Sequence, residues 1–187
     1  MSKPPLFPRH NRPDLPADIQ QRMDDVEQKA GFVPEVFNVF SRRPDEFRAF
    51  FAYHDALMEK DSELSKGERE MIVVATSALN RCLYCVIAHG AITRIREKAP
   101  RLADQLATDY RKADITPRQL AMLEFACKLS QQPAQINQSD FDELTSHGFS
   151  QEAIWDIGAV SAFFALSNRM ASLTDMRPND EFYSMGR

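Results

Sequence analysis

The sequence is poor in glycine, with six in 187 residues, and it has no valine-rich stretch in which apolar and polar residues alternate. Alternating β-branched residues are the main signal of a strand, and glycine is common in the turns between strands. A β-sheet is therefore disfavoured, and the predicted fold class is all-α. The apolar periodicity and helix-end signals predict helices at residues 16–30, 34–41, 45–60, 66–79, 82–97, 99–110, 117–130, 140–147 and 151–174.

The sequence also lacks an excess of basic residues and any long apolar run. Lysine and arginine total 23, against 27 aspartates and glutamates, and the net charge is −4. Without a dominant basic face, nucleic acid and anionic membranes are disfavoured as partners. No stretch approaches the ~18 apolar residues of a membrane-spanning helix. The first 16 residues do not resemble a secretory signal, so we expect a cytoplasmic protein with reduced thiols.

Proline separates two arms from a central region. Five of the 11 prolines lie within the first 16 residues, which favours an extended arm at 1–15 over a helix. The closing segment 176–187 is also expected to be irregular. Between the arms we expect one helical domain at 16–175, long enough to bury a sizeable core. Large apolar residues in both arms are consistent with docking and, equally, with frayed ends.

Capping patterns indicate where three helices start and two end. "SKGE" at 65–68 and "TPRQ" at 116–119 have the capping-box spacing, the second with proline at the favoured first helical position. "SDFD" at 139–142 is expected to start a helix in the same way. Gly31 and Gly148 follow helical patterns and are suited to a left-handed stop.

The stretch "NRCLYCVIAHG" at 80–90 contains the main candidate site. Cys82 and Cys85 are three residues apart, and His89 follows four residues later. If Asn80 adopts the left-handed conformation that ends helices, both cysteines fall in the first turns of a new helix. Cys85 and His89 would then share a face, because four residues nearly close a helical turn. Helix amides and an imidazole can lower a thiol pKa by about two units, which favours a redox pair.

The triplet also has interpretations other than a redox pair. Zinc would accept two thiolates and an imidazole, but it needs a fourth ligand. His10, His54 and His147 form no second cluster in the sequence. Covalent haem fails because valine follows the second cysteine where that motif needs histidine. Two core cysteines beside a capping histidine remain an alternative.

"LSKGEREMIVVATSALNRCLYCVIAHGA" resembles the core motif of the AhpD-like alkylhydroperoxidase and carboxymuconolactone decarboxylase superfamily. That motif has a glutamate, a Cys-x-x-Cys pair twelve residues later and a histidine four after the second cysteine. The matching residues are Glu70, Cys82, Cys85 and His89. Flanking segments from residue 31 to the closing "PNDEFYSMGR" are similar to a branch labelled peroxidase-related. The resemblance implies an AhpD-like helical bundle.

The resemblance also implies a thiol-dependent peroxidase. Cys85 resembles the peroxidatic cysteine, which a hydroperoxide oxidises to sulfenic acid, and Cys82 resembles the resolving cysteine that closes the disulfide. Glu70 and His89 resemble a proton relay for Cys85. In an unbroken helix Glu70 would lie about 18 Å from Cys82, so the relay requires the break at Asn80. A dithiol donor of the dihydrolipoamide or thioredoxin type would restore the enzyme, with no metal, flavin or other cofactor.

Two other functions remain open at this point. The chain could be a non-enzymatic redox sensor, in which the disulfide changes docking of the arms or assembly. It could also be an enzyme of the carboxymuconolactone decarboxylase kind, although that side of the superfamily generally lacks the cysteine pair. Members of the superfamily are usually homo-oligomers, which agrees with the strongly apolar helix at 151–174.

For several other residues we expect mainly structural roles. Tyr84 is expected to pack on a neighbouring helix rather than to shape a pocket mouth. His54 is expected to be a hydrogen-bonded helix histidine rather than a site residue. Cys127 and Trp155 are expected in the core. Arg169 is expected either in a structural ion pair or beside a buried carboxylate near the site.

Overall fold

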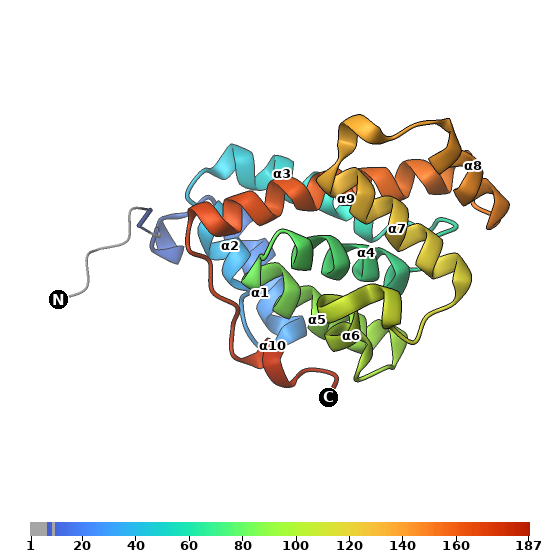
Figure 1. Cartoon of the computed structure of the whole chain (residues 1–187). Helices are drawn as coiled ribbons and strands as arrows, with labels where there is room; N and C mark the ends of the chain where they lie inside the picture. Colours follow the sequence, from blue (N-terminus) through green and yellow to red (C-terminus); the bar gives the residue numbers. More distant parts are fainter. Residues whose placement is uncertain (1–6, 9) are drawn as a thin grey trace.

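A computed structural model of the chain describes residues 7, 8 and 10–187, and these residues form helices and no strands (Figure 1). The predicted all-α class is confirmed. The α-helices are α1 (Ala17–Ala30), α2 (Glu35–Phe40), α3 (Pro44–Met58), α4 (Lys66–Leu79), α5 (Leu83–Glu97), α6 (Leu102–Asp109), α7 (Pro117–Gln131), α8 (Gln138–Ser146), α9 (Gln151–Leu173) and α10 (Glu181–Ser184). Short 3-10 helices are η1 (Arg12–Asp14), η2 (Tyr110–Lys112) and η3 (Pro133–Gln135). Within these described ranges, no helix has the length and apolarity needed to cross a membrane.

Helix α4 lies at the centre of the molecule. Figure 1 shows it enclosed by its neighbours, and it packs against α5, α6, α7 and α9. Every residue from Gly67 to Ser77 is buried. A helix that is apolar over most of its surface is stable only when it is covered on all sides. Polar side chains on α4 therefore face the interior, where each needs a partner.

Two of the three predicted helix starts are confirmed. Ser65 and Thr116 both cap their helices through complete capping boxes. The start predicted at 139–142 is wrong, because Asn137 is the N-cap of α8 and accepts the Ser139 amide at 3.0 Å. The Asp140 carboxylate accepts the Asn137 amide at 2.9 Å and completes the box. Asparagine caps a helix as well as serine does, so the helix begins two residues earlier.

The predicted helix ends are confirmed at the glycines and differ by one residue after α4. Gly31 and Gly148 have φ of 84° and 85°. Asn80 remains right-handed, with φ of −80°, and Arg81 takes the left-handed conformation, with φ of 53°. The predicted interruption between the two helices is therefore present, but the prediction of a left-handed Asn80 is wrong.

The C-terminal arm docks on the helical core. The expectation of an irregular segment is wrong at 181–184, which form α10. Phe182 is buried and meets the Phe32 ring edge-on, with centroids 5.0 Å apart. The buried Arg94 of α5 donates to the carbonyls of Phe182 at 2.8 Å and Met185 at 2.9 Å. These contacts attach the end of the chain to α5.

The N-terminal arm is described only in part. Residues 1–6 and 9 lie outside the described residues, so the predicted extended conformation is not tested there. Residues 12–14 form η1, which corrects the expectation of an extended arm at these positions. The Phe7 ring lies beside the Arg42 guanidinium, 5.5 Å from its centroid to the guanidinium carbon.

Helix α9 exposes one apolar face, which we call the α9 stripe: Trp155, Ala162, Leu166 and Leu173. These residues are seven, four and seven positions apart and therefore share one side of the helix. Trp155 is 73% exposed, so its prediction as a core residue is wrong. Leu166 and Leu173 are 51% and 58% exposed. The other faces of α9 pack on α3, α4, α5 and α7, and the burial of Cys127, on α7, is confirmed.

Candidate active site

The two cysteines lie at the corner between α4 and α5. The amide of Arg81 donates to the Ala78 carbonyl and the amide of Cys82 donates to the Ser77 carbonyl, both at 3.0 Å. This pair of bonds is a Schellman motif, which places the left-handed residue one position after the C-cap. The motif explains why Arg81, and not Asn80, has positive φ. Helix α5 then runs along α4.

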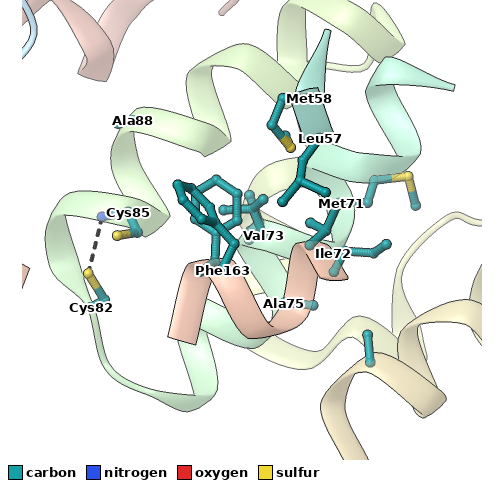
Figure 2. Close-up of a cluster of buried hydrophobic side chains, with 14 of the residues drawn as sticks. Leu57, Met58, Met71, Ile72, Val73, Ala75, Cys82, Cys85, Ala88 and Phe163 are labelled. Atoms are coloured by element: carbon teal, nitrogen blue, oxygen red, sulfur yellow. Dashed lines mark hydrogen bonds between the residues drawn. The ribbon is translucent and has the colours of Figure 1, made fainter. Parts of the chain in front are cut away.

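Cys82 is the N-cap of α5. Its sulfur accepts the backbone amide of Cys85 at 3.4 Å, drawn as a dashed line in Figure 2. The sequence predicts Cys82 as the first residue inside the helix, whereas the structure places it at the N-cap, one position before the helix begins. Both thiols are free and buried, with Cys82 2% exposed and Cys85 fully covered. They lie at one end of the apolar cluster drawn in Figure 2.

The pKa values of the two thiols shift in opposite directions. A hydrogen bond from Cys85 lowers the pKa of Cys82 from 9.0 to about 7, with further help from backbone amides and Asn168. The same bond, together with burial, raises the pKa of Cys85. The pKa of Cys82 therefore lies below the ordinary value of a thiol, and the pKa of Cys85 lies above it. The difference arises because the capping sulfur receives N–H groups, whereas Cys85 acts as its donor.

Glu70 and His89 meet across the corner. The Glu70 Oε2 lies 2.7 Å from the His89 Nδ1, and the two side chains are 9% and 13% exposed. The Phe164 ring packs edge-on against the imidazole, with centroids 4.7 Å apart. The predicted approach of Glu70 to His89 is confirmed, and it depends on the break that lets α5 run back along α4. His89 lies one turn along α5 from Cys85.

Asn168 and Ser167 of α9 also lie at this corner, and the sequence does not predict their position there. The Asn168 side chain lowers the pKa of both thiols, and its amide is held by Ser77 and Asn80, each at 2.9 Å. The Ser167 Oγ lies 4.0 Å from the Cys85 Sγ. A signal was present, because "LSN" interrupts an otherwise apolar helix, and buried polar groups need partners. The sequence alone does not say which partners they find.

The remaining candidates have structural contacts. Tyr84 is buried, and its hydroxyl accepts the Val36 amide at 3.2 Å, so the packing role is confirmed. His54 is a hydrogen-bonded helix histidine, as predicted, with its Nδ1 3.1 Å from Asp55. Arg169 is exposed and donates to a carbonyl one turn earlier, at 2.6 Å, so the prediction of an ion pair is wrong.

No three histidine, cysteine, aspartate or glutamate side chains gather at metal-binding spacing anywhere in residues 7, 8 and 10–187. The thiols and His89 therefore do not form a ready ligand set in this arrangement. What the site does contain is a thiol pair with unequal proton affinities beside a carboxylate and imidazole pair.

Comparison with known proteins identifies the family. Residues 44–126 match the family model of the Carboxymuconolactone decarboxylase family. The crystal structure titled alkylhydroperoxidase AhpD core, an uncharacterized peroxidase-related protein from Ralstonia eutropha JMP134, superposes with a TM-score of 0.96 and 61% identity over 100% of this chain and 98% of its own. The chain belongs to the AhpD-like carboxymuconolactone decarboxylase superfamily. A peroxidase-related protein from Silicibacter sp. TM1040 agrees, with a TM-score of 0.92 and 39% identity over 100% of both chains.

The AhpD-like fold also occurs in more distant proteins. The debrominase Bmp8, in complex with 2,3,4-tribromopyrrole, superposes on this AhpD-like chain with a TM-score of 0.82 and 21% identity, over 99% of this chain and 97% of its own. At that identity the likeness shows a common fold only. A search of curated proteins found no match.

Proposed function

We propose that this AhpD-like protein reduces hydroperoxides with its Cys82 and Cys85 pair. The observation that carries the proposal is the capping position of Cys82, which accepts N–H groups and has a pKa of about 7 beside the protonated Cys85. The thiolate is the reactive form of cysteine. A thiol of this pKa is about half ionised at pH 7, against roughly 1% for a pKa of 9.

The first step is attack by the Cys82 thiolate on a peroxide oxygen. The O–O bond breaks, Cys82 becomes a sulfenic acid, and the leaving alkoxide takes the Cys85 S–H proton to give an alcohol. The Cys85 thiolate then attacks the Cys82 sulfur, which forms the disulfide and releases hydroxide. A proton held between Glu70 and His89 converts this hydroxide to water. A dithiol donor, of the dihydrolipoamide or thioredoxin type, then supplies two electrons and two protons.

This order exchanges the two cysteine roles that the resemblance implies. The resemblance assigns the first attack to Cys85. The contacts favour Cys82, because its sulfur accepts the backbone amide of Cys85 at 3.4 Å and the neighbouring thiol lowers its pKa. Cys85 is then well placed as the proton donor for the leaving alkoxide and as the second nucleophile.

Single-cysteine variants test the proposal. With a hydroperoxide and excess dithiol, both Cys82→Ser and Cys85→Ser should lose sustained peroxide consumption. Cys85→Ser should retain one turnover and form a sulfenic acid on Cys82 that dimedone traps. Cys127→Ser is the control and should keep full activity. Full turnover by either of the first two variants would refute the proposal, and a sulfenic acid trapped only in Cys82→Ser would reverse the order.

We also propose that a second copy of this chain is a binding partner. The α9 stripe is symmetric about residue 164, with Trp155 and Leu173 nine residues to either side and Ala162 and Leu166 two residues to either side. Two antiparallel copies of α9 would place Trp155 against Leu173 of the partner subunit. A two-fold interface requires this kind of self-complementary surface.

Light scattering tests this assembly. Leu166→Glu places a charge at the centre of the stripe and should convert a dimer, or a larger assembly, to smaller units. Tyr183→Glu is the control, since Tyr183 is 46% exposed and lies outside α9. An unchanged mass for Leu166→Glu would refute the α9 interface.

A redox sensor is the second candidate function, and the position of Asn168 favours it. Asn168 lowers the pKa of both thiols and lies on the same helix that carries the α9 stripe. A disulfide could therefore alter assembly through α9. This function would be supported if oxidation changed the oligomer mass while turnover stayed at the rate of a free thiol.

A further inference from the structure

A groove lies between α2 and the C-terminal end of α9, two elements that Figure 1 shows next to each other. Its volume is about 760 Å³, which is within the range of small-molecule sites. Val39 and Phe40 of α2 and Met170 of α9 give it an apolar lining. Arg42 and Arg43, which follow α2, add two cations. An apolar cavity with a few charged groups is typical of a binding site.

Arg42 is a lining cation without an anionic partner. The Arg43 guanidinium lies 2.5 Å from the Glu46 carboxylate. The Arg42 side chain forms no ion pair or hydrogen bond within residues 7, 8 and 10–187, and its contact there is with the Phe7 ring. A ring attracts a cation but leaves its charge unbalanced. The planar N–H donors of Arg42 therefore remain available, and their geometry matches a carboxylate.

The other lining carboxylates are held by partners within the chain. Asp175 lies 2.7 Å from the Arg177 guanidinium. Glu35 is 8% exposed and accepts the Asn38 amide at 3.2 Å. Seven residues separate Glu35 from Arg42, which at a helical rise is roughly 10 Å. An anion bound by Arg42 is therefore separated from the Glu35 carboxylate.

The cavity between α7 and α8 has the opposite arrangement of charge. Its volume is about 580 Å³. Arg111 and Lys128 line it, and they lie 2.7 Å and 2.5 Å from the carboxylates of Glu124 and Asp140. Because these cations are balanced within the chain, they attract an added anion less than Arg42 does.

We infer that the groove between α2 and α9 binds an amphipathic carboxylate. The apolar chain of this ligand lies on Val39, Phe40 and Met170, and its carboxylate binds the Arg42 guanidinium. Burial of the chain supplies the affinity, and the ion pair selects acids over neutral molecules of the same length.

Both walls of the groove begin beside the thiol corner. The Val36 amide of α2 donates to the Tyr84 hydroxyl of α5 at 3.2 Å. Met170 lies one turn after Ser167, whose Oγ is 4.0 Å from the Cys85 Sγ. Methionine is unbranched and adapts its shape at low cost, so Met170 can make room for a chain that reaches toward the corner. The substrate class, which rests on the proposed function, is a hydroperoxide with a carboxylate at the end far from the peroxide.

The first experiment is a calorimetric titration of octanoate and of 1-octanol into the reduced protein. The two probes share a chain and differ in charge. Wild type should bind octanoate about three- to fivefold more tightly, as expected for one ion pair at a partly exposed site. Arg42→Gln should remove this difference by weakening octanoate alone, and Arg42→Lys, which keeps the charge, should retain part of it. Val39→Asn should weaken both probes, because it places an amide in the apolar lining.

Arg101→Gln is the matched control. Arg101 is exposed, precedes α6 and does not line the groove, so the variant makes the same change of net charge elsewhere. It should bind octanoate as wild type does. Octanoate binding that is unchanged in Arg42→Gln, or equally weakened in Arg101→Gln, overturns the inference. A wild-type protein that does not prefer octanoate to 1-octanol also overturns it.

The second experiment concerns the substrate class. With excess dithiol, turnover of the 9-hydroperoxide of linoleic acid is compared with turnover of its methyl ester. Wild type should have a KM about three- to fivefold lower for the acid, and Arg42→Gln should raise that KM to the value for the ester with kcat unchanged. Equal KM values for the acid and the ester in wild type would overturn this substrate class.

The groove and the peroxidase activity can fail separately. If wild type reduces neither hydroperoxide but Arg42→Gln weakens octanoate, the peroxidase proposal fails and the groove stands as a carboxylate site. If both hydroperoxides are reduced and Arg42→Gln leaves octanoate binding unchanged, the groove inference fails and the peroxidase proposal stands.

Discussion

At the scale of single residues, the proton distribution between Cys82 and Cys85 follows from their places in one helical turn. The capping sulfur accepts the backbone N–H of Cys85, and the neighbouring Cys85 thiol lowers its pKa. The pair therefore keeps one proton on Cys85 near neutral pH. In the proposed reaction, this division would provide a nucleophile and an acid three residues apart.

Removing the Cys85 thiol should raise the pKa of Cys82. Cys85→Ala deletes the donor that contributes most to the low value, so the thiolate midpoint should move from about 7 toward the ordinary value of about 8.5. Cys85→Ser retains an O–H donor and should stay closer to 7. Absorbance at 240 nm against pH measures both. A midpoint near 7 in Cys85→Ala would mean that backbone amides alone hold the thiolate.

The same pKa shift affects the stability of the reduced protein. The pKa of Cys82 is lower in the folded state, so its contribution to the free energy of unfolding is present above the unfolded pKa and is lost as pH falls toward about 7. The melting temperature should therefore fall between pH 8.5 and 7 in wild type and change less over that range in Cys82→Ser. An equal change in both proteins would contradict this assignment.

The sequence predicted which residues meet at the corner between α4 and α5 better than it predicted their ionisation. The spacing of Glu70 and His89 foresaw their pairing, because the helix period and one break define it. The order of the two thiol pKa values depends on which lone pair meets which N–H group, and that requires coordinates. The position of the Asn168 side chain depends on hydrogen bonds to residues 88 and 91 positions away in the sequence, which local patterns do not encode.

At the scale of helices, the corner after α4 determines the geometry of the site. Arg81 is exposed and has a φ of 53°, a conformation that costs a residue with a Cβ about 1–2 kcal/mol. The bond from the Cys82 amide to Ser77 holds the corner in place.

Substitutions of Arg81 should show this strain. Arg81→Gly adopts the same conformation without a Cβ clash and should raise the free energy of unfolding by up to about 1 kcal/mol. Arg81→Val is β-branched and should lower it by about 1 kcal/mol or more. Chemical denaturation measures both. Equal stabilities for the two variants would show that the corner is unstrained.

The start of α8 offers a second test at this scale. Asn137→Ala removes the cap and should cost about 1 kcal/mol in the free energy of unfolding. Ser139→Ala, at the position that the sequence favoured, should change it by less than about 0.5 kcal/mol. Urea denaturation distinguishes them, and a larger loss for Ser139→Ala would contradict the capping geometry.

Local sequence signals explain why the positions of the helices could be predicted and why some details could not. The nine predicted helices are present within a few residues, because capping residues and apolar periodicity act over one or two turns. Asn137 was missed because serine, asparagine and aspartate alternate around that start and offer several caps. Trp155 was misplaced because α9 is apolar on nearly every turn, so its pattern does not show which face is left uncovered.

At the scale of the whole molecule, the C-terminal arm is part of the packed structure. Helix α10 is only four residues long, and its position depends on Arg94, which is 88 and 91 residues away from the carbonyls it binds. Such a short helix has no periodicity to detect, which explains why this segment was predicted to be irregular.

Truncating the anchor of this arm should destabilise the protein. Phe182→Ala removes a buried ring and should cost about 3 kcal/mol, which corresponds to a fall of roughly 6–12 °C in melting temperature. Tyr183→Ala changes the exposed neighbour and should have little effect. Calorimetry of the two variants gives the comparison, and similar melting temperatures would show that the arm contributes nothing to stability.

Because all three cysteines are buried, the rate at which a thiol reagent labels them would report local opening of the reduced protein. None of the sulfurs belongs to a residue more than 4% exposed. A bulky aromatic disulfide reagent should therefore label the native chain slowly, at a rate limited by local opening of the surrounding helices. Comparing the labelling rates of Cys127 and of the Cys82 and Cys85 pair would then show which end of the molecule opens first.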